Sequence, residues 1–364
     1  MARFFLLALR RPGPVGAEPP AEVIVPCAGT DPELEQRLNA MLRQDYSGPL
    51  RFVFVTPSRE DPAWAVLESL ASRHPGRVVA LASGRTPKGR SGKIEDLLFA
   101  LESLEPGTER LLFADSDILA PAGWLRALLS PLDDPAVGAA TAAMLYLPRR
   151  LSPGSLLRLA WTGFGLPFFA FAGGVTGQSW AVRRADFDAL GVRELWSRSL
   201  YEDLALTPVL RRWGKAVRFV PAAMPVTPDA AGLADAAAVF DKWIKAYRFY
   251  DLRTWALGAA VTALKTAALA WALLPPARPG LACLVMGMDA AFTACSLGGL
   301  QALYPERFAA CGLPGPAWAW AALFTPFLQA AFALNYARSL LSRDIRWGGR
   351  SYRVHGPQDI EVLG

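Results

Sequence analysis

Two aspartates separated by a single residue stand directly behind an apolar run in the sequence LLFADSDI. Asp115 and Asp117 follow residues 111–114, which read as a buried strand. Two carboxylates at one spot are hard oxygen ligands, and they suit Mg²⁺ or Mn²⁺ bridging a diphosphate. The same D-x-D pattern also arises at a helix N-cap, and residues 120–129 would supply that helix. The surrounding elements must decide between these two interpretations.

A second acidic pair lies in the sequence LYEDLALTPVLRRWG. Glu202 and Asp203 open an apparent helix that ends near Gly214. Carboxylates at a helix start are stabilised by the helix dipole, which is a purely structural reason for their presence. A carboxylate at such a position also suits a general base.

A third element combines cations with aromatic rings just before a long apolar segment. Residues 239–251 contain Lys242, Trp243 and Arg248. This composition is typical of a helix at a membrane surface. The same cations would also suit a phosphate group.

The elements that must position these residues alternate between strands and helices from residue 22 to about residue 219. Strands are predicted at 22–26, 50–56, 77–82, 110–117 and 137–145, and helices at 31–44 and 61–74. Such alternation predicts an α/β fold with a mostly parallel sheet. Ligands bind beyond the carboxyl ends of the strands in these sheets. Asp115 and Asp117 are therefore expected at a ligand crevice.

The composition indicates a protein that is partly in lipid. Hydrophobic residues make up 52% of the 364 residues and charged residues only 19%, and the mean hydropathy is +0.23. The net charge of +6 favours an anionic membrane surface as a partner and not nucleic acid, because the basic residues flank apolar segments. The four cysteines lack metal-binding spacing and the chain has two histidines, so we expect no zinc or thiol site and treat the cysteines as apolar fillers.

Three long apolar segments, 255–274, 280–303 and 317–337, each reach the length that spans a bilayer. Lys265 and Asp289 lie at equal distances from the turn between the first two, so they should meet at similar depth. We predict a contact between them, because lone charges in hydrocarbon are costly; a lysine that snorkels to the surface is the alternative.

The orientation of the chain in the membrane has two conflicting signals. Three spans would carry the tail across the bilayer, whereas arginines 343, 346, 350 and 353 favour a tail on the cytoplasmic side, with the catalytic domain. A re-entrant segment, broken by Pro326, would reconcile them. We expect a multi-pass membrane protein.

Along the chain, a strand with a D-x-D motif is followed by the Glu-Asp pair, the cationic and aromatic helix and the apolar segments. In this order the motifs resemble the lipid-modifying inverting glycosyltransferases of the GT-A fold, in particular the ceramide glucosyltransferase and hopanoid-associated families. The resemblance covers residues 23–354 and rests on REDPAW (59–64), GRSGKIEDLL (89–98), ADSDI (114–118), the segment 173–191, YEDLALT (201–207) and WGGRSYRV (347–354). It implies a UDP-sugar donor, first of all UDP-glucose, and a lipid acceptor such as ceramide, a hopanoid or a diacylglycerol.

The resemblance also implies roles for single residues. It assigns Asp61 to the uridine side of the donor, Lys93 to the diphosphate, and Asp203 to the general base, with Glu202 beside it. The family's pattern of Gln or Arg, two residues, then Arg-Trp falls on Val239, Lys242 and Trp243, which departs from it at two positions. Lysine lacks the bidentate phosphate binding of arginine, and valine removes a polar contact.

The residues themselves predict a mechanism. Asp117 and Asp115 would hold the divalent cation against the diphosphate, while Lys242 and Arg248 grip the phosphates from the other side. Asp203 would take the proton of an attacking hydroxyl, and one displacement would invert the anomeric carbon. Trp243 and residues 161–174 would line a lipid entrance; the latter stretch is equally consistent with buried core or an interfacial helix.

Three other functions are weighed. A processive polysaccharide synthase should have more spanning helices and an intact Gln-x-x-Arg-Trp pattern. A polyprenyl-phosphate glycosyltransferase would use a phosphate nucleophile and depend less on Asp203. A non-catalytic membrane scaffold fits Val239 but leaves the retained carboxylates unexplained.

The expected domain organisation has five segments. They are an N-terminal segment (1–21), a GT-A catalytic domain (22–238), an amphipathic interface helix (239–252), transmembrane or re-entrant helices (253–341) and a basic tail (342–364). The apolar stretch in MARFFLLALRRPG is too short to span a bilayer. It reads as an interfacial anchor or as the remainder of a helix, and the resembled family has a membrane helix there.

Overall fold

The computed structural model describes residues 5–6, 18–309 and 315–363. Most of the predicted N-terminal segment and Cys311 lie outside these residues. The chain divides into two compact units, each described here by itself. The sheet unit comprises the described parts of Arg10–Met144, Gly173–Val226 and Gly348–Gly364, and the helical unit those of Met1–Leu9, Leu145–Ala172 and Thr227–Trp347.

The sheet unit is built on a seven-stranded sheet of order β3-β2-β1-β4-β7-β5-β8. Its strands are β1 (Ala21–Pro26), β2 (Leu50–Thr56), β3 (Val78–Ala82), β4 (Arg110–Ala114), β7 (Ser179–Arg183), β5 (Val137–Thr141) and β8 (Ala216–Phe219). Only β7 runs antiparallel to its neighbours, β4 and β5. The predicted mostly parallel α/β fold is therefore confirmed.

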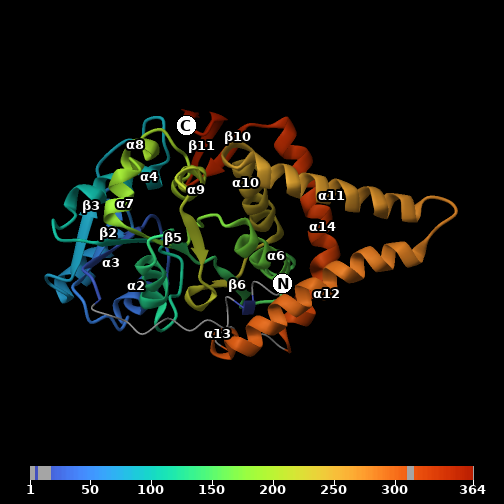
Figure 1. Cartoon of the computed structure of the whole chain (residues 1–364), viewed down its shortest axis with the longest axis horizontal. Helices are drawn as coiled ribbons and strands as arrows, with labels where there is room; N and C mark the ends of the chain where they lie inside the picture. The colour runs from blue at the N-terminus through green and yellow to red at the C-terminus, as the bar shows by residue number, and fades with distance from the viewer. Residues whose placement is uncertain (1–4, 7–17, 310–314, 364) are drawn as a thin grey trace. The chain divides into compact units, whose positions relative to one another are not determined.

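Helices complete this unit (Figure 1). They are α2 (Leu34–Leu42), α3 (Trp64–Arg73), α4 (Gly92–Ala100), α5 (Trp124–Leu129), α7 (Arg184–Ala189), α8 (Val192–Trp196) and α9 (Glu202–Arg212). In the core, the Phe113 ring of β4 stacks on Trp180 at 4.5 Å and meets the edge of Trp196 at 5.3 Å. A C-terminal antiparallel hairpin of β11 (Arg350–Gly356) and β12 (Asp359–Val362) belongs to the same unit.

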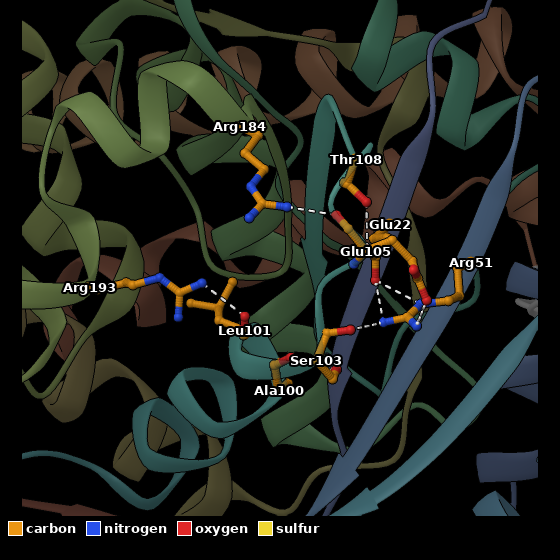
Figure 2. A network of polar contacts seen from close by, with 9 residues as sticks. All are labelled: Glu22, Arg51, Ala100, Leu101, Ser103, Glu105, Thr108, Arg184 and Arg193. Carbon is orange, nitrogen blue, oxygen red and sulfur yellow. Dashed lines mark hydrogen bonds and ion pairs between the residues drawn. The ribbon is translucent and has the colours of Figure 1, made fainter.

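A polar network closes the amino end of the central strands (Figure 2). Glu22, at the start of β1, is only 1% exposed. It accepts hydrogen bonds from the Arg51 Nε at 2.9 Å, the Glu105 amide at 2.7 Å and the Thr108 hydroxyl at 2.5 Å. Because both of its oxygens have donors, the cost of burying this carboxylate is offset.

The helical unit contains α6 (Pro153–Ala172), α10 (Leu233–Tyr250), α11 (Leu252–Leu273), α12 (Pro279–Leu303), α13 (Pro305–Ala309) and α14 (Ala317–Leu341), with the short strands β6 (Leu145–Pro148), β9 (Val226–Asp229) and β10 (Asp344–Trp347). Helices α11 and α12 form a long hairpin (Figure 1). Four of the described helices, α6, α11, α12 and α14, are long and apolar enough to cross a membrane. Three of them, α11, α12 and α14, match the apolar segments predicted from the sequence; the stretch 161–174 of α6 was expected to line a lipid entrance or to be buried core or an interfacial helix.

The predicted contact between the charges of α11 and α12 is confirmed. The Lys265 ammonium is ion-paired with the Asp289 carboxylate, and it also lies 5.0 Å from the centre of the Phe164 ring of α6. The predicted break at Pro326 is wrong, because helix α14 runs continuously through this proline. The cysteines in the described residues, Cys27, Cys283 and Cys295, are not in disulfides.

Candidate active site

The carboxyl end of β4 brings together acidic and basic side chains from three distant parts of the sequence. Strand β4 ends at Ala114, so Asp115 is the first residue beyond the buried strand. Its carboxylate lies 2.5 Å from the Lys93 ammonium. The same ammonium contacts the Glu202 carboxylate. One lysine thus links the D-x-D motif to the Glu-Asp motif.

Lys93 owes its place to the start of α4. Ser91 is the N-cap of this helix, and its hydroxyl accepts a hydrogen bond from the Ile94 amide at 3.2 Å, as preferred at this position. Lys93 is the second residue of the helix and its side chain is 17% exposed. Burial by itself would lower the pKa of Lys93, but the Asp115 and Glu202 carboxylates raise it above its ordinary value. The lysine is therefore a cation at neutral pH.

Glu202 opens α9 and is almost completely buried. Its side chain is 2% exposed, and its Oε2 has no hydrogen-bond partner among the residues that the structure describes. The indole of Trp196 donates to the Glu202 backbone carbonyl at 3.1 Å, which fixes the helix start from the core side. A buried carboxylate with one unsatisfied oxygen is costly, so this residue is poised to accept a further donor.

Asp203 has the protonation behaviour of a base that works near neutral pH. It accepts hydrogen bonds from the Gly177 amide at 2.6 Å and from its neighbour, the Leu204 amide, at 2.7 Å. Burial and the negative charge of Glu202 raise the pKa of Asp203 to about 7, although Lys93 and the two amides oppose this shift. General bases are most effective when their pKa lies near the working pH.

Gly177 belongs to this site and was not predicted from the sequence as a site residue. A Cβ at Gly177 would lie 2.7 Å from the Glu202 Oε1 and 3.1 Å from the Asp203 Oδ2. Only glycine lets its backbone amide approach Asp203 so closely. The third glycine of the segment GGVTGQSW was the only sign of this residue in the sequence. Its hydrogen-bond partner, Asp203, lies in another element.

The remaining predicted acidic residues, Asp117 and Asp61, also belong to the sheet unit. Asp117 is exposed to solvent beyond β4. Asp61, after β2, accepts hydrogen bonds from the Gly29 amide at 2.9 and 3.1 Å and from the Ala63 amide at 2.9 Å. It therefore holds together the loops that follow β1 and β2.

The predicted cationic and aromatic residues of α10 lie in the helical unit. The Lys242 ammonium lies 5.2 Å from the centre of the Trp347 ring. Trp243 packs against Trp161 at 5.2 Å and Tyr146 at 6.0 Å. Arg248 donates to the Ser339 carbonyl of α14.

The residues present fit a divalent cation that completes its shell with ligand oxygens. No group of three or more His, Cys, Asp or Glu side chains suited to a metal ion occurs in the described part of the chain. Asp115 and Asp117 offer two carboxylates, and the ammonium beside Asp115 shows that a cation is accommodated there. Mg²⁺ in proteins is commonly held by one or two carboxylates together with substrate phosphates.

A mostly parallel sheet with a D-x-D motif at the end of a central strand defines the GT-A class of glycosyltransferases. The profile of Glycosyl transferase family 21 matches residues 2–360, so the chain belongs to this family and is a glycosyltransferase that uses a nucleotide sugar. No match was found among curated proteins.

Two solved structures are reported as similar to this chain, and the first of them shares its fold. A mannosyltransferase from Pyrobaculum calidifontis, in complex with GDP-Man and Mn²⁺, is 19% identical, with 93% of this chain and 94% of that chain covered and a TM-score of 0.50. Glucosyl-3-phosphoglycerate synthase from Mycobacterium tuberculosis, in complex with Mn²⁺, UDP and phosphoglyceric acid, is 17% identical, with 65% and 83% covered and a TM-score of 0.41.

Proposed function

We propose that this protein is a membrane-bound inverting hexosyltransferase. It transfers a hexose from a UDP-sugar, with UDP-glucose as the first candidate, to a hydroxyl group of a lipid such as ceramide, a hopanoid or a diacylglycerol. The observation that carries this proposal is the contact of Lys93 with both Asp115 and Glu202. Three motifs that were predicted separately to bind the donor, the metal and the acceptor proton meet in one network.

In the proposed reaction, Asp203 is the catalytic base. Its carboxylate accepts the proton of the acceptor hydroxyl while the hydroxyl oxygen forms a bond with the anomeric carbon. The bond from that carbon to the diphosphate oxygen breaks, and its electron pair leaves with UDP. A single in-line displacement inverts the anomeric configuration. The hydrogen bonds from Gly177 and Leu204 to Asp203 hold the base in one orientation.

The donor diphosphate would be met by charges of the sheet unit. Lys93 contacts Asp115 at the carboxyl end of β4 and is a cation at neutral pH, and we propose that it binds the diphosphate. Asp115 and Asp117 would hold Mn²⁺ or Mg²⁺, which neutralises charge that develops on the leaving group. We propose Asp61 for the uridine side. The Pyrobaculum neighbour was solved with a nucleotide sugar and Mn²⁺, the class of ligands proposed here.

Residues of α10 would supply further donor contacts. We propose that Lys242 and Arg248 bind phosphate and that Trp243 lines the lipid entrance. The packing of Trp243 against Trp161 of α6 supports the last assignment, because it joins α10 to an apolar helix. Val239 stands where the resembled family has a polar residue. Because valine offers no polar contact to the donor, we propose that the affinity for the donor depends on Lys242 more than in that family.

A lipid acceptor is supported by the helical unit. Its four membrane-capable helices would hold the enzyme at the bilayer, and a soluble acceptor would give no reason for this attachment. We propose that the sheet unit faces the cytoplasm, because arginines 343, 346, 350 and 353 follow the last apolar helix. Protease digestion of the sheet unit in inverted membrane vesicles, but not in sealed cells, is the expected result.

The experiment that tests the function is a transfer assay with the purified, detergent-solubilised protein. UDP-glucose, UDP-galactose and UDP-N-acetylglucosamine are each offered with a mixed lipid extract and Mn²⁺. We expect labelled sugar in the lipid fraction, and no label with Asp203→Asn. Transfer from all donors to water alone, or undiminished transfer by the variant, would contradict the proposal.

A further inference from the structure

A short loop, residues 197–201, leads from α8 into α9 and so sets where Glu202 stands. The Ser199 amide donates to the Trp196 carbonyl at 3.1 Å, and the Ser199 hydroxyl donates to the Leu195 carbonyl at 2.8 Å. These bonds run back to α8, the helix just before the loop. They shape the loop, but they do not fix it against α4, the helix that carries the lysine of the site.

Arg90 is the side chain that joins this loop to α4. It lies two residues before the helix, and its Nη1 donates to the Ser197 carbonyl at 3.0 Å. Ser197 is the C-cap of α8, so its carbonyl has no partner within that helix. The Nε of the same guanidinium donates at 2.6 Å to the Oε2 of Glu95, in the first turn of α4. One rigid, planar group thus connects the end of α8 to the start of α4.

The contact between Arg90 and Glu95 is an ion pair with a buried carboxylate. The Glu95 side chain is 2% exposed and that of Arg90 is 24% exposed. Because a buried carboxylate needs a cation and hydrogen bonds, this pair holds the guanidinium in one place. A second hydrogen bond joins the same two segments, since the Ser91 amide donates to the Ser199 carbonyl at 3.4 Å. The loop before α9 is therefore held to α4 through two of its carbonyls, those of Ser197 and Ser199.

This link bears on the contacts of Lys93. The lysine ammonium lies 2.5 Å from Asp115, which follows β4, and it also contacts Glu202, which opens α9. The first contact needs only α4 and the sheet, whereas the second also needs the loop before α9 to stay against α4. We propose that Arg90 is a positioning residue that holds Glu202 against Lys93. Its consequence for sugar transfer rests on the proposed function, because Asp203 is the residue after Glu202, and Arg90 would then keep the base close to the cation that binds the diphosphate.

The first test measures Lys93 without any substrate. Arg90→Met removes both contacts of the guanidinium, and lysine acetylation by acetic anhydride is followed by mass spectrometry in the full-length protein. Because the lysine keeps one carboxylate partner and loses the other, we expect Lys93 to react about fivefold faster, the ratio that corresponds to one lost hydrogen bond. Lys215, whose ammonium donates to the Pro135 carbonyl of the same unit, is the internal reference and should react at the wild-type rate. An unchanged Lys93 rate would overturn the proposal.

Arg51→Met is the matched control, because Arg51 makes the same two kinds of contact at the opposite end of the sheet (Figure 2). Its Nε donates at 2.9 Å to Glu22, whose side chain is 2% exposed, and its Nη2 donates to the Ser103 carbonyl. Loss of this arginine should lower stability but leave the labelling of Lys93 unchanged. An equal rise of the Lys93 rate in both variants would indicate a general loosening of the unit and would contradict a positioning role.

A second variant separates the position of the loop from the charge of Glu95. In Arg90→Met the buried carboxylate loses its cation, which is destabilising by itself. Glu95→Gln is therefore used as a background, in which Arg90 still donates to the Ser197 carbonyl and Lys93 should react at the wild-type rate. Arg90→Met in this background leaves no unpaired charge, and Lys93 should again react about fivefold faster. A fast rate in Glu95→Gln that does not rise further in the double variant would contradict the proposal.

The third test asks whether Arg90 acts through Glu202. Acetylation of Lys93 is compared in Arg90→Met, Glu202→Leu and the double variant. Leucine cannot bind the ammonium, so Glu202→Leu should raise the Lys93 rate by itself, and Arg90→Met should add nothing to that increase. Additive effects in the double variant would show that Arg90 acts on the lysine by another route and would overturn the proposal.

The effect on catalysis is measured separately, because it rests on the proposed function. We expect Arg90→Met to lower the transfer rate at saturating UDP-glucose about tenfold, while Arg51→Met keeps the wild-type rate as long as it is folded. An undiminished rate in Arg90→Met would exclude a role of Arg90 in the reaction. Wild-type protein that transfers no sugar would instead count against the proposed function, and the labelling tests would still decide whether Arg90 positions Glu202.

Discussion

Each end of the central sheet buries a glutamate beside a cation, but the two carboxylates differ in how completely they are hydrogen-bonded. At the amino end, Glu22 has donors for both oxygens: Arg51, the Glu105 amide and Thr108. At the carboxyl end, the Glu202 Oε1 contacts Lys93, while Oε2 has no partner within the described residues. The first network is complete without a ligand, and the second is not.

This difference indicates which of the two sites can gain free energy by binding a ligand. A buried carboxylate with satisfied oxygens stabilises the fold and offers nothing to a ligand. An unsatisfied carboxylate lowers stability, and such sites coincide with perturbed protonation and with function. The raised pKa of Asp203 lies beside the incomplete network. We therefore expect substitutions at the carboxyl end to affect transfer and those at the amino end to affect stability.

Loss of the base should have the largest effect on transfer. Asp203→Asn keeps the shape of the side chain but cannot accept a proton, so transfer should fall by about 10³-fold. The raised pKa means that the ionised carboxylate opposes folding at neutral pH, but asparagine can accept only one of the two amide hydrogen bonds. These effects oppose each other, so the stability of the variant should stay within about 1 kcal/mol of wild type. Initial rates of lipid glycosylation measure the transfer activity, and thermal unfolding measures the stability. A variant that melts early and retains wild-type rates would contradict the assignment.

Removal of the metal should come next. Chelation with EDTA should lower transfer by about 10²-fold, because the diphosphate charge is no longer neutralised, and added Mn²⁺ should restore it. Asp117→Ala should reproduce the loss.

Asp133→Ala is the control for this experiment. Asp133 pairs with Arg110 at the opposite end of β4 at 3.3 Å, and it is exposed. Its replacement should leave the rate and the metal requirement unchanged. If both variants lost transfer activity equally, the rate would depend on β4 as a whole and not on the carboxylates at its carboxyl end.

Crowding of the two carboxylates at the start of α9 should have a smaller effect. In Gly177→Ala, the new methyl group would lie 2.7 Å from the Glu202 Oε1, so the acidic pair must move. We expect a rate that is about 10- to 100-fold lower. Gly174→Ala in the same loop is matched, because its methyl group would find its nearest neighbour, Thr207, at 3.7 Å. This control should retain the wild-type rate.

The pH dependence of transfer should be the mildest effect and the most specific one. Asp203 acts only when ionised, and its pKa is raised to about 7. The rate at saturating donor should therefore rise about tenfold per pH unit below pH 7 and level off above it. An aspartate with its ordinary pKa would give a flat profile from pH 5 upward. Such a flat profile would remove Asp203 as the base.

Local patterns predicted most of the parallel sheet and the acidic motifs. Asp115 follows a short apolar run, and Glu202 opens a helix with a clear end at Gly214, so both could be placed from neighbouring residues alone. The contact between Lys265 and Asp289 followed from equal distances to one turn. In each case the signal lies within a few helical turns of the residue concerned.

Features that depend on distant partners could not be predicted. Lys93 and Glu202 are 109 positions apart, and no periodicity specifies that one ammonium bridges Asp115 and Glu202. The network around Glu22 depends on the register of β1 with β2 and β4. Helix α6 contains Pro167 and several glycines, which obscured its helical pattern and its place among the apolar helices.

The most direct test compares one conservative change at each end of the sheet. Glu202→Gln and Glu22→Gln are purified side by side, and the transfer rate and the free energy of unfolding are measured for each. We expect Glu202→Gln to lose transfer by about 10-fold or more with stability within about 1 kcal/mol of wild type. Glu22→Gln should lose about 3 kcal/mol of stability and keep its rate while folded. The reverse pattern would show that the carboxyl-end cluster is structural and would contradict the account.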